Sequence, residues 1–364
     1  MFSRNTPNQQ PGLFGLKHSN RDFTQKDAWG KNCFNNSFPA SLCAYLYSRN
    51  IDNIYIKLNS NLEVEHSSIN TAYFYGINPD SDNLFYAFET QFTPYQQYLI
   101  GALPRADLVT QQRDTGSCLQ AVEVKLTALP DNSTCDLLDE SLYGCEIVVR
   151  PDTIVYLACS IAEYFAQDIN LLKSLIIGNF EEIEDWTEPS EVITHLSSMF
   201  DSLKLIMLSM VAVQKPSVMQ PIWKTVSKSP KLADNCLDVF VWSNLAFIKL
   251  ILDSSKLDSK PNKTITVGRH IRAVVWLFKM IYDFSQHYQF DYRKIVSIAC
   301  NTKNDKAFSV NGKFTNFYMR SEFLRMPRIQ KTEIKEIILG GGQNLLSPER
   351  RFDAIICNSS DLFD

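Results

Sequence analysis

The feature that most constrains the fold is a pair of opposite charges inside an apolar, β-prone run. The run CLQAVEVKLTAL, residues 118–129, contains Glu123 and Lys125 between apolar neighbours. Side chains two positions apart in a strand point to the same face of a sheet. In a strand covered on both faces, such charges are costly to bury without a partner or a metal ion. The run is therefore either a functional strand in a buried sheet or an exposed edge that carries an ordinary ion pair.

A second strand-like run supplies another acid. Asp107 lies in RADLVT, residues 105–110, and the turn-like segment QQRDTGS separates this run from the one with Glu123. A hairpin would place Asp107 beside Glu123, and two adjacent carboxylates repel each other unless a hard cation lies between them. Mg²⁺ accepts two carboxylates and fills its other positions with water and substrate phosphate. Lys125 would then orient or deprotonate an attacking water.

The order of expected elements divides the chain into four parts. We expect an irregular arm over 1–30, a catalytic core over 31–168, a mainly helical region over 169–260, and a helix followed by a basic and aromatic region over 261–364. Within the core, spacing near 3.6 residues predicts a helix over 84–101, whereas 105–110, 118–129 and 145–151 are strand-like. A hydrophobic content of 45% with 21% charged residues is typical of a globular protein.

Charge, cysteines and the N-terminus restrict the setting. A net charge of −4 counts mildly against nucleic-acid binding, although a cleft can be locally positive. The nine cysteines form no C-x-x-C pair, so we expect free thiols and a reducing cytoplasm. The polar N-terminal segment lacks the apolar core of a signal peptide, and charges interrupt the apolar runs. These observations predict a cytoplasmic protein without a membrane span.

Other catalytic chemistries find little support. The five histidines show no metal-ligand spacing, and no serine or cysteine has the partnered histidine of a nucleophilic triad. The GGGQ segment at 340–343 lacks the Lys-Ser/Thr that follows in a phosphate-binding loop. The two acids and the lysine therefore predict a metal-dependent site.

Four segments resemble a known family. FETQFTPYQ, PRADLV, EVKLTALPD and YGCEIVVRP are similar to the HindVP family of type II restriction endonucleases, within the PD-(D/E)xK nuclease superfamily. The resemblance covers residues 85–160 and extends more loosely over the remainder. It implies an α/β core with an α+β mixed sheet and a large helical elaboration. It also implies catalytic roles for Asp107, Glu123 and Lys125. The chain departs from the general pattern because Arg105 and Ala106, rather than proline, precede the aspartate.

The resemblance also implies a substrate and partners. It implies a prokaryotic enzyme that cuts double-stranded DNA with Mg²⁺ at a specific sequence, such as a GRCGYC-like palindrome. A palindrome implies two-fold protein symmetry and hence a homodimer. A cognate DNA methyltransferase would protect the same site in the host.

Further residues are candidates for the site or the DNA interface. Glu89 is positioned as the helical acid that assists metal binding in many nucleases of this fold, or it is a solvated helix acid. Thr127 would share the strand face of Lys125. The C-terminal basic residues could bind phosphates or read guanine, or form an ordinary charged surface; they are Arg320, Arg325, Arg328, Lys331, Arg350 and Arg351.

Two alternatives remain from the sequence alone. A repair or junction nuclease with the same core would cut by DNA structure rather than by sequence. A non-catalytic DNA-binding or scaffold protein would use Glu123 and Lys125 as a structural ion pair.

Overall fold

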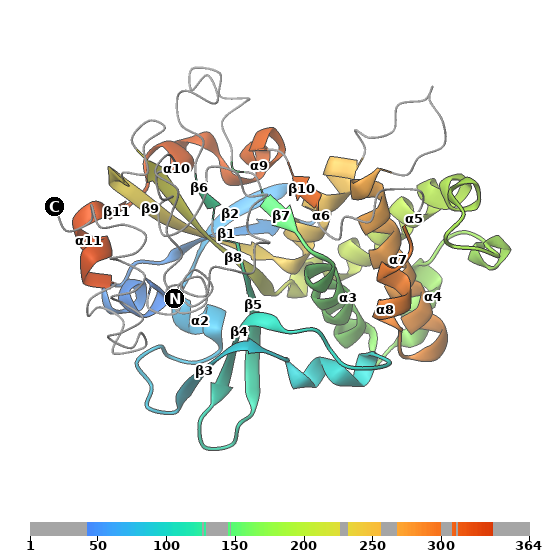
Figure 1. Ribbon diagram of the computed structural model, residues 1–364, viewed down its shortest axis with the longest axis horizontal. Helices are drawn as coiled ribbons and strands as arrows, with labels where there is room; N and C mark the ends of the chain where they lie inside the picture. Colours follow the sequence, from blue (N-terminus) through green and yellow to red (C-terminus); the bar gives the residue numbers. More distant parts are fainter. Residues whose placement is uncertain are drawn as a thin grey trace, which may run out of the picture.

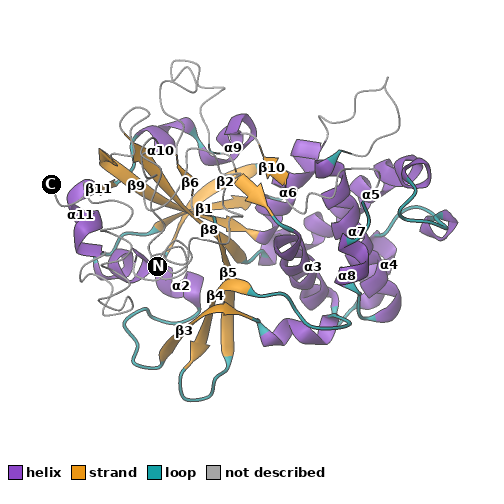
Figure 2. Ribbon diagram, in the orientation of Figure 1, coloured by secondary structure: helices purple, strands orange, loops and turns teal. Residues whose placement is uncertain are grey.

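A mixed sheet and a layer of helices make up the computed structural model, which describes residues 42–125, 127–128, 145, 147–225, 232–255, 268–299, 308–310 and 312–337. Figure 1 shows the large sheet in one half of the molecule and α3 to α8 in the other, and Figure 2 shows the same division by type of element.

Nine of the described strands form the large sheet, in the order β2-β1-β9-β8-β5-β4-β3, with β11 paired to β9 and β6 paired to β8. The pairs β1–β9, β5–β8 and β6–β8 are parallel, and the other pairs are antiparallel. A sheet of this mixed kind is what the predicted fold class requires. The strands are β1 (Asn53–Leu58), β2 (Val64–Ile69), β3 (Leu84–Thr90), β4 (Ala106–Gln112), β5 (Cys118–Val124), β6 (Thr127–Ala128), β8 (Pro216–Thr225), β9 (Leu232–Ser243) and β11 (Ile329–Gln330).

The helices cover both faces of this sheet. A separate two-stranded sheet pairs β7 (Ile147–Val149) with β10 (Phe308–Val310) and leads directly into α3. Residues 42–48 are also helical. The remaining helices are α2 (Thr71–Tyr75), α3 (Pro151–Phe165), α4 (Ile169–Leu175), α5 (Pro189–Met210), α6 (Asn244–Ser255), α7 (Arg269–His287), α8 (Tyr292–Val296), α9 (Gly312–Met319), α10 (Ser321–Arg325) and α11 (Lys331–Glu336), with 3-10 turns η3 (Thr93–Tyr98), η4 (Phe180–Glu182) and η5 (Val211–Val213).

The core lies on both sides of the sheet. In β9, Phe240 and Trp242 pack into the cluster shared with α3, α6 and α7, whereas Val239 and Val241 pack into the cluster shared with residues 42–46, α2 and α11. Side chains alternate between the faces of a strand, so a strand covered on both faces needs a continuous apolar run. The apolar run VFVW, residues 239–242, meets that need.

The predicted helix over 84–101 is wrong. Leu84–Thr90 is strand β3, with Leu84 and Tyr86 buried and Phe85 exposed, and Thr93–Tyr98 is a 3-10 helix with Pro94 near its start. Aromatic residues spaced by three and four positions had indicated a helix. The burial of Leu84 and Tyr86 on one face and the antiparallel pairing of the segment with β4 show that it follows the two-residue period of a strand.

The region 169–260 also contains elements that the sequence analysis missed. Between α5 and α6 lie β8 and β9, which pair antiparallel with each other and form the centre of the sheet. Their apolar runs do not distinguish a buried strand from a buried helix by periodicity. Because β8 pairs with β5, these strands belong to the same sheet as the predicted catalytic residues.

One helical segment within the described residues, Pro189–Val213, is long and apolar enough to span a bilayer by length and composition. Its core residues, such as Met199, Leu203 and Ile206, are completely buried. Core helices of globular proteins also meet this criterion.

Candidate active site

The β4–β5 hairpin brings the predicted acids together. Leu108 pairs with Val122 in the antiparallel register, and Asp107 Oδ2 accepts a hydrogen bond of 2.8 Å from the backbone N–H of Val124. The reversal is tight because Gly116 has a φ of 69° and donates its N–H to the carbonyl of Gln112 at 2.8 Å. The turn that the sequence predicted therefore places Asp107 beside the end of the strand that carries Glu123.

Glu123 and Lys125 form a largely buried ion pair. Lys125 follows the last residue of β5, and its backbone N–H donates to the carbonyl of Met219 in β8 at 2.8 Å. Its ammonium binds Glu123 Oε1, and the side chains of Lys125 and Glu123 are only 10% and 13% exposed. The same-face placement predicted from the spacing is therefore present. The exposed-edge alternative does not describe these two residues.

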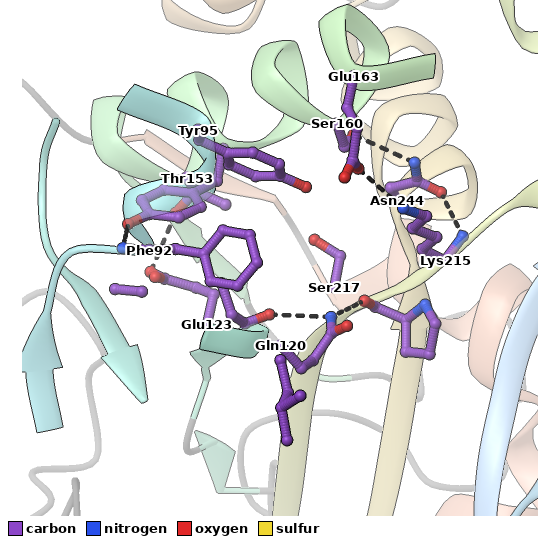
Figure 3. A pocket seen from close by; sticks show the side chains of 15 residues that line it. Phe92, Tyr95, Gln120, Glu123, Thr153, Ser160, Glu163, Lys215, Ser217 and Asn244 are labelled. Carbon is purple, nitrogen blue, oxygen red and sulfur yellow. Dashed lines mark hydrogen bonds and ion pairs between the residues drawn. The ribbon is translucent and has the colours of Figure 1, made fainter. Parts of the chain in front are cut away.

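The first turn of α3 completes the surroundings of Glu123. Thr153 Oγ1 donates to Glu123 Oε1 at 3.1 Å, and Figure 3 shows this bond at one end of a pocket. Glu163 and Lys215, which form an ion pair of 2.8 Å, lie at the opposite end of the pocket. The remaining lining residues come mainly from β5, α3 and the start of β8.

The electrostatics of the site disfavour several negative charges in the absence of a cation. Desolvation and the charge of Glu123 raise the pKa of Asp107 to about 7, against the opposing effects of Lys125 and of the Val124 N–H. Desolvation and the charge of Glu123 also raise the pKa of Asp152, at the start of α3. Both carboxylates would be stabilised in their ionised form by a bound dication.

Glu89 lies near the site but comes from a strand rather than from the expected helix. Its neighbours in β3 pair with Leu108 and Ala106, so Glu89 occupies the register position opposite Asp107. It is exposed and has a φ of 49°, which is the left-handed region. Its negative charge contributes to the raised pKa of both Asp107 and Asp152.

The donor set fits Mg²⁺. Asp107 and Glu123 supply hard carboxylate oxygens, and their mutual repulsion gives a dication a favourable environment. Within the described ranges, no three His, Cys, Asp or Glu side chains gather into a cluster that could hold a metal ion unaided. Mg²⁺ needs no such cage, because it is usually held by one or two carboxylates together with waters and substrate phosphates.

Arg328 has an internal partner. Its Nε donates to Asp238 Oδ2 at 3.0 Å and to Oδ1 at 3.2 Å, and its Nη2 donates to Oδ1 at 2.7 Å; Asp238 lies in β9. Asp238 is 3% exposed, whereas Arg328 is 42% exposed. The pair therefore joins the segment before β11 to the central sheet, which gives Arg328 a structural role besides any contact with DNA.

Those of the other predicted DNA contacts that the structure describes lie on elements other than β4 and β5, which carry the acids. Thr127 lies in β6 and pairs with Ile222 of β8. Arg320 is exposed and has a φ of 53°, and its Nη1 lies 3.6 Å from Glu322 Oε1. Arg325 ends α10 and Lys331 begins α11, and both are half-buried. Arg350 and Arg351 lie outside the described residues.

The contribution of α3 to the site was not predicted from the sequence. Asp152 and Thr153 follow Pro151, which occupies the first turn of the helix. A helix start after the strand CEIVVRP was visible in the sequence, but the position of Thr153 beside Glu123 depends on tertiary packing. The structure thus brings together Asp107, Glu123 and Lys125 as predicted and adds Thr153.

Fold and site together define a class of protein. The mixed sheet with flanking helices is consistent with an α/β restriction-endonuclease-like fold, as the sequence predicted. In this sheet Asp107 and the E-x-K sequence lie on neighbouring strands.

Comparison with known proteins identifies the family. Residues 29–363 match the HindVP restriction endonuclease family. The chain is 45% identical to the probable type II restriction enzyme HindVP of Haemophilus influenzae, with 98% of this chain and 96% of the relative covered. It is 46% identical to the type II restriction enzyme HgiDI of Herpetosiphon aurantiacus, with 98% of each chain covered. The chain therefore belongs to the HindVP restriction endonuclease family, which confirms the predicted family and class of enzyme.

No solved structure matches the chain.

Proposed function

We propose that the chain is a type II restriction endonuclease that hydrolyses phosphodiester bonds of double-stranded DNA with Mg²⁺. The observation that carries the proposal is the meeting of Asp107, Glu123 and Lys125 at the end of the β4–β5 hairpin. A structural ion pair alone would not explain why Asp107 stands beside Glu123 with a pKa raised to about 7. A metal-binding site gives both carboxylates a function.

Each of the three residues has a distinct role in this proposal. Asp107 and Glu123 would hold Mg²⁺, which would supply Lewis acidity for the attack of water on the phosphodiester bond. Lys125 is held beside Glu123 by their ion pair, where its ammonium can orient an attacking water and stabilise the charge on the phosphate. Glu89 is exposed and lies opposite Asp107 in the register, where it adds negative charge near the site.

The substrate and partners follow from the family. We propose recognition of a short palindrome, such as a GRCGYC-like sequence, by a homodimer whose two-fold axis matches that of the DNA. A cognate methyltransferase would modify the same sequence. The enzyme would work in the bacterial cytoplasm, in keeping with five free cysteines among the described residues.

The DNA interface is proposed from the basic residues near the C-terminus. Arg320 is exposed, and Arg325 and Lys331 are partly accessible, so these three can reach phosphates or base edges. The same role is proposed for Thr127, Arg350 and Arg351. Arg328 can contribute only with the part of its guanidinium that its pair with Asp238 leaves accessible.

The proposal is tested by incubating the purified protein with unmethylated phage DNA and Mg²⁺, followed by sequencing of the fragment ends. We expect discrete fragments whose ends share one short palindromic sequence, and no cleavage in EDTA. Cleavage only at branched DNA would instead indicate a junction nuclease. Intact DNA in the presence of Mg²⁺ would contradict the proposed activity.

A further inference from the structure

Thr153 makes an unusual contact for a buried hydroxyl in the first turn of a helix. Thr153 is 2% exposed, and its Oγ1 donates to Glu123 Oε1 at 3.1 Å across the interface between α3 and the sheet (Figure 3). Serine and threonine hydroxyls near a helix start commonly bond to backbone groups of their own helix. Here the hydroxyl is directed to a carboxylate of another element. The interaction is charge-assisted and therefore stronger than a neutral hydrogen bond.

Two donors share the same oxygen of Glu123. Lys125 Nζ and Thr153 Oγ1 both bind Oε1. No donor from the described residues bonds to Oε2. Because Lys125, just after β5, and Thr153 of α3 hold the carboxylate through one oxygen, its rotation is restricted and the second oxygen is left for another ligand.

The hydroxyl is held in place by the packing of α3. One turn after Thr153, the hydroxyl of Tyr156 accepts from the N–H of Phe92 at 3.2 Å and donates to the carbonyl of Pro104 at 3.0 Å. Phe92 follows β3, and Pro104 precedes the strand that carries Asp107. The start of α3 is therefore tied to the segments on either side of the site, which fixes the position of Thr153 relative to the carboxylates.

We propose that Thr153 is a positioning residue that orients the carboxylate of Glu123 for metal binding. Together with Lys125 it binds Oε1 and directs Oε2 toward the cation. The inference rests on the metal site proposed above. Residues that orient metal ligands typically change metal affinity by about 10- to 100-fold when they are replaced.

The test compares three variants. Thr153→Val removes the hydroxyl while keeping the shape of the side chain, and Thr153→Ser retains the hydroxyl. Thr110→Val is the matched control, because Thr110 is also fully buried but donates its hydroxyl to the carbonyl of Tyr75 at 2.8 Å rather than to a carboxylate. Thr153→Ala removes the same hydroxyl and replaces the valine variant if that variant does not fold.

The measurement is Mn²⁺ binding to the metal-free protein, followed by the electron paramagnetic resonance signal of free Mn²⁺. We expect the dissociation constant to rise about 10- to 100-fold in Thr153→Val. The dissociation constant of Thr153→Ser should lie near that of wild type, and the dissociation constant of Thr110→Val should be unchanged. Unchanged Mn²⁺ affinity in the folded Thr153→Val or Thr153→Ala protein would overturn the positioning role.

A further variant separates this inference from the proposed function. Glu123→Ala should lose Mn²⁺ binding at the site. If wild type and Glu123→Ala bind Mn²⁺ equally, the metal site itself is wrong and the role of Thr153 falls with it. If Glu123→Ala loses binding while the Thr153 variants keep it, only the role of Thr153 is overturned.

Discussion

The carboxylate of Asp107 accepts a hydrogen bond of 2.8 Å from the backbone N–H of Val124, the residue between Glu123 and Lys125. One bond thus joins the acid of β4 to the sequence E-x-K at the end of β5. The oxygen that accepts this bond is held in place, while the carboxylate remains close enough to Glu123 for their charges to interact. The geometry of the site and its pH dependence therefore depend on the same pair of strands.

Asp107 should destabilise the metal-free protein at neutral and higher pH. Its pKa rises from an ordinary value of 3.8 to about 7 on folding, so folding disfavours the ionised form. The contribution of this group to stability is therefore fully present below about pH 4 and is lost as the pH rises through about 7. Asp107→Asn should flatten this decline in EDTA. Thermal unfolding from pH 5 to 8.5 would measure it, and parallel profiles for both proteins would contradict the raised pKa.

Protons and Mg²⁺ should compete for Asp107. Below about pH 7 the carboxyl is protonated and must lose its proton before it can bind a cation. The Mg²⁺ concentration that gives half-maximal cleavage should fall as the pH rises from 6 to 8 and then level off. Cleavage rates over a grid of Mg²⁺ concentration and pH would test this. A half-saturating concentration independent of pH would argue against Asp107 as a ligand.

Glu89→Gln should lower the pKa of Asp107. Glu89 lies opposite Asp107 in the β3–β4 register, and its charge is one of the causes of the raised pKa. The midpoint of the pH-dependent loss of stability in EDTA should therefore move to lower pH. Asp114→Asn, an exposed change at the hairpin turn, is the control and should leave the midpoint in place. An identical midpoint in Glu89→Gln would remove Glu89 from the electrostatics of the site.

Arg328→Ala should reduce stability, whatever its effect on DNA binding. The change leaves Asp238, which is 3% exposed, without its bidentate partner. Because Arg328 itself is 42% exposed, we expect a loss of about 1–3 kcal/mol rather than the larger cost of breaking a fully buried pair. Chemical denaturation would measure the lost free energy of unfolding. The double variant Arg328→Ala, Asp238→Asn should recover part of this loss. Unchanged stability with weaker DNA binding would assign Arg328 to the DNA interface instead.

Several parts of the site could be predicted because they depend on local rules. The alternation of side chains in a strand places Glu123 and Lys125 on one face, and the turn around Gly116 makes the hairpin with Asp107. The class of fold followed from these strands and from the family resemblance. The alternation within the strand and the hairpin turn both depend on residues close together in sequence.

Other parts depend on tertiary context and could not be predicted. The segment 84–90 has aromatic residues that satisfy both a helical and a strand period, and pairing with β4 decides between them. The apolar runs of β8 and β9 likewise fit a buried helix or a buried strand. Thr153 reaches Glu123 only because α3 packs on that face of the sheet, a relation that no local pattern in the sequence shows.

Lys125, the lysine of the E-x-K sequence, should act directly in DNA cleavage. The most direct measurement compares the cleavage rates of wild type and Lys125→Ala on unmethylated DNA at saturating Mg²⁺, after thermal unfolding shows that the variant is folded. Lys215→Ala, which removes an exposed lysine at the far end of the pocket, is the control. We predict discrete fragments from wild type and Lys215→Ala, and a rate lower by about 10²- to 10⁴-fold for Lys125→Ala. If Lys125→Ala produces discrete fragments at the wild-type rate, Lys125 has no role in cleavage and the proposed site is wrong.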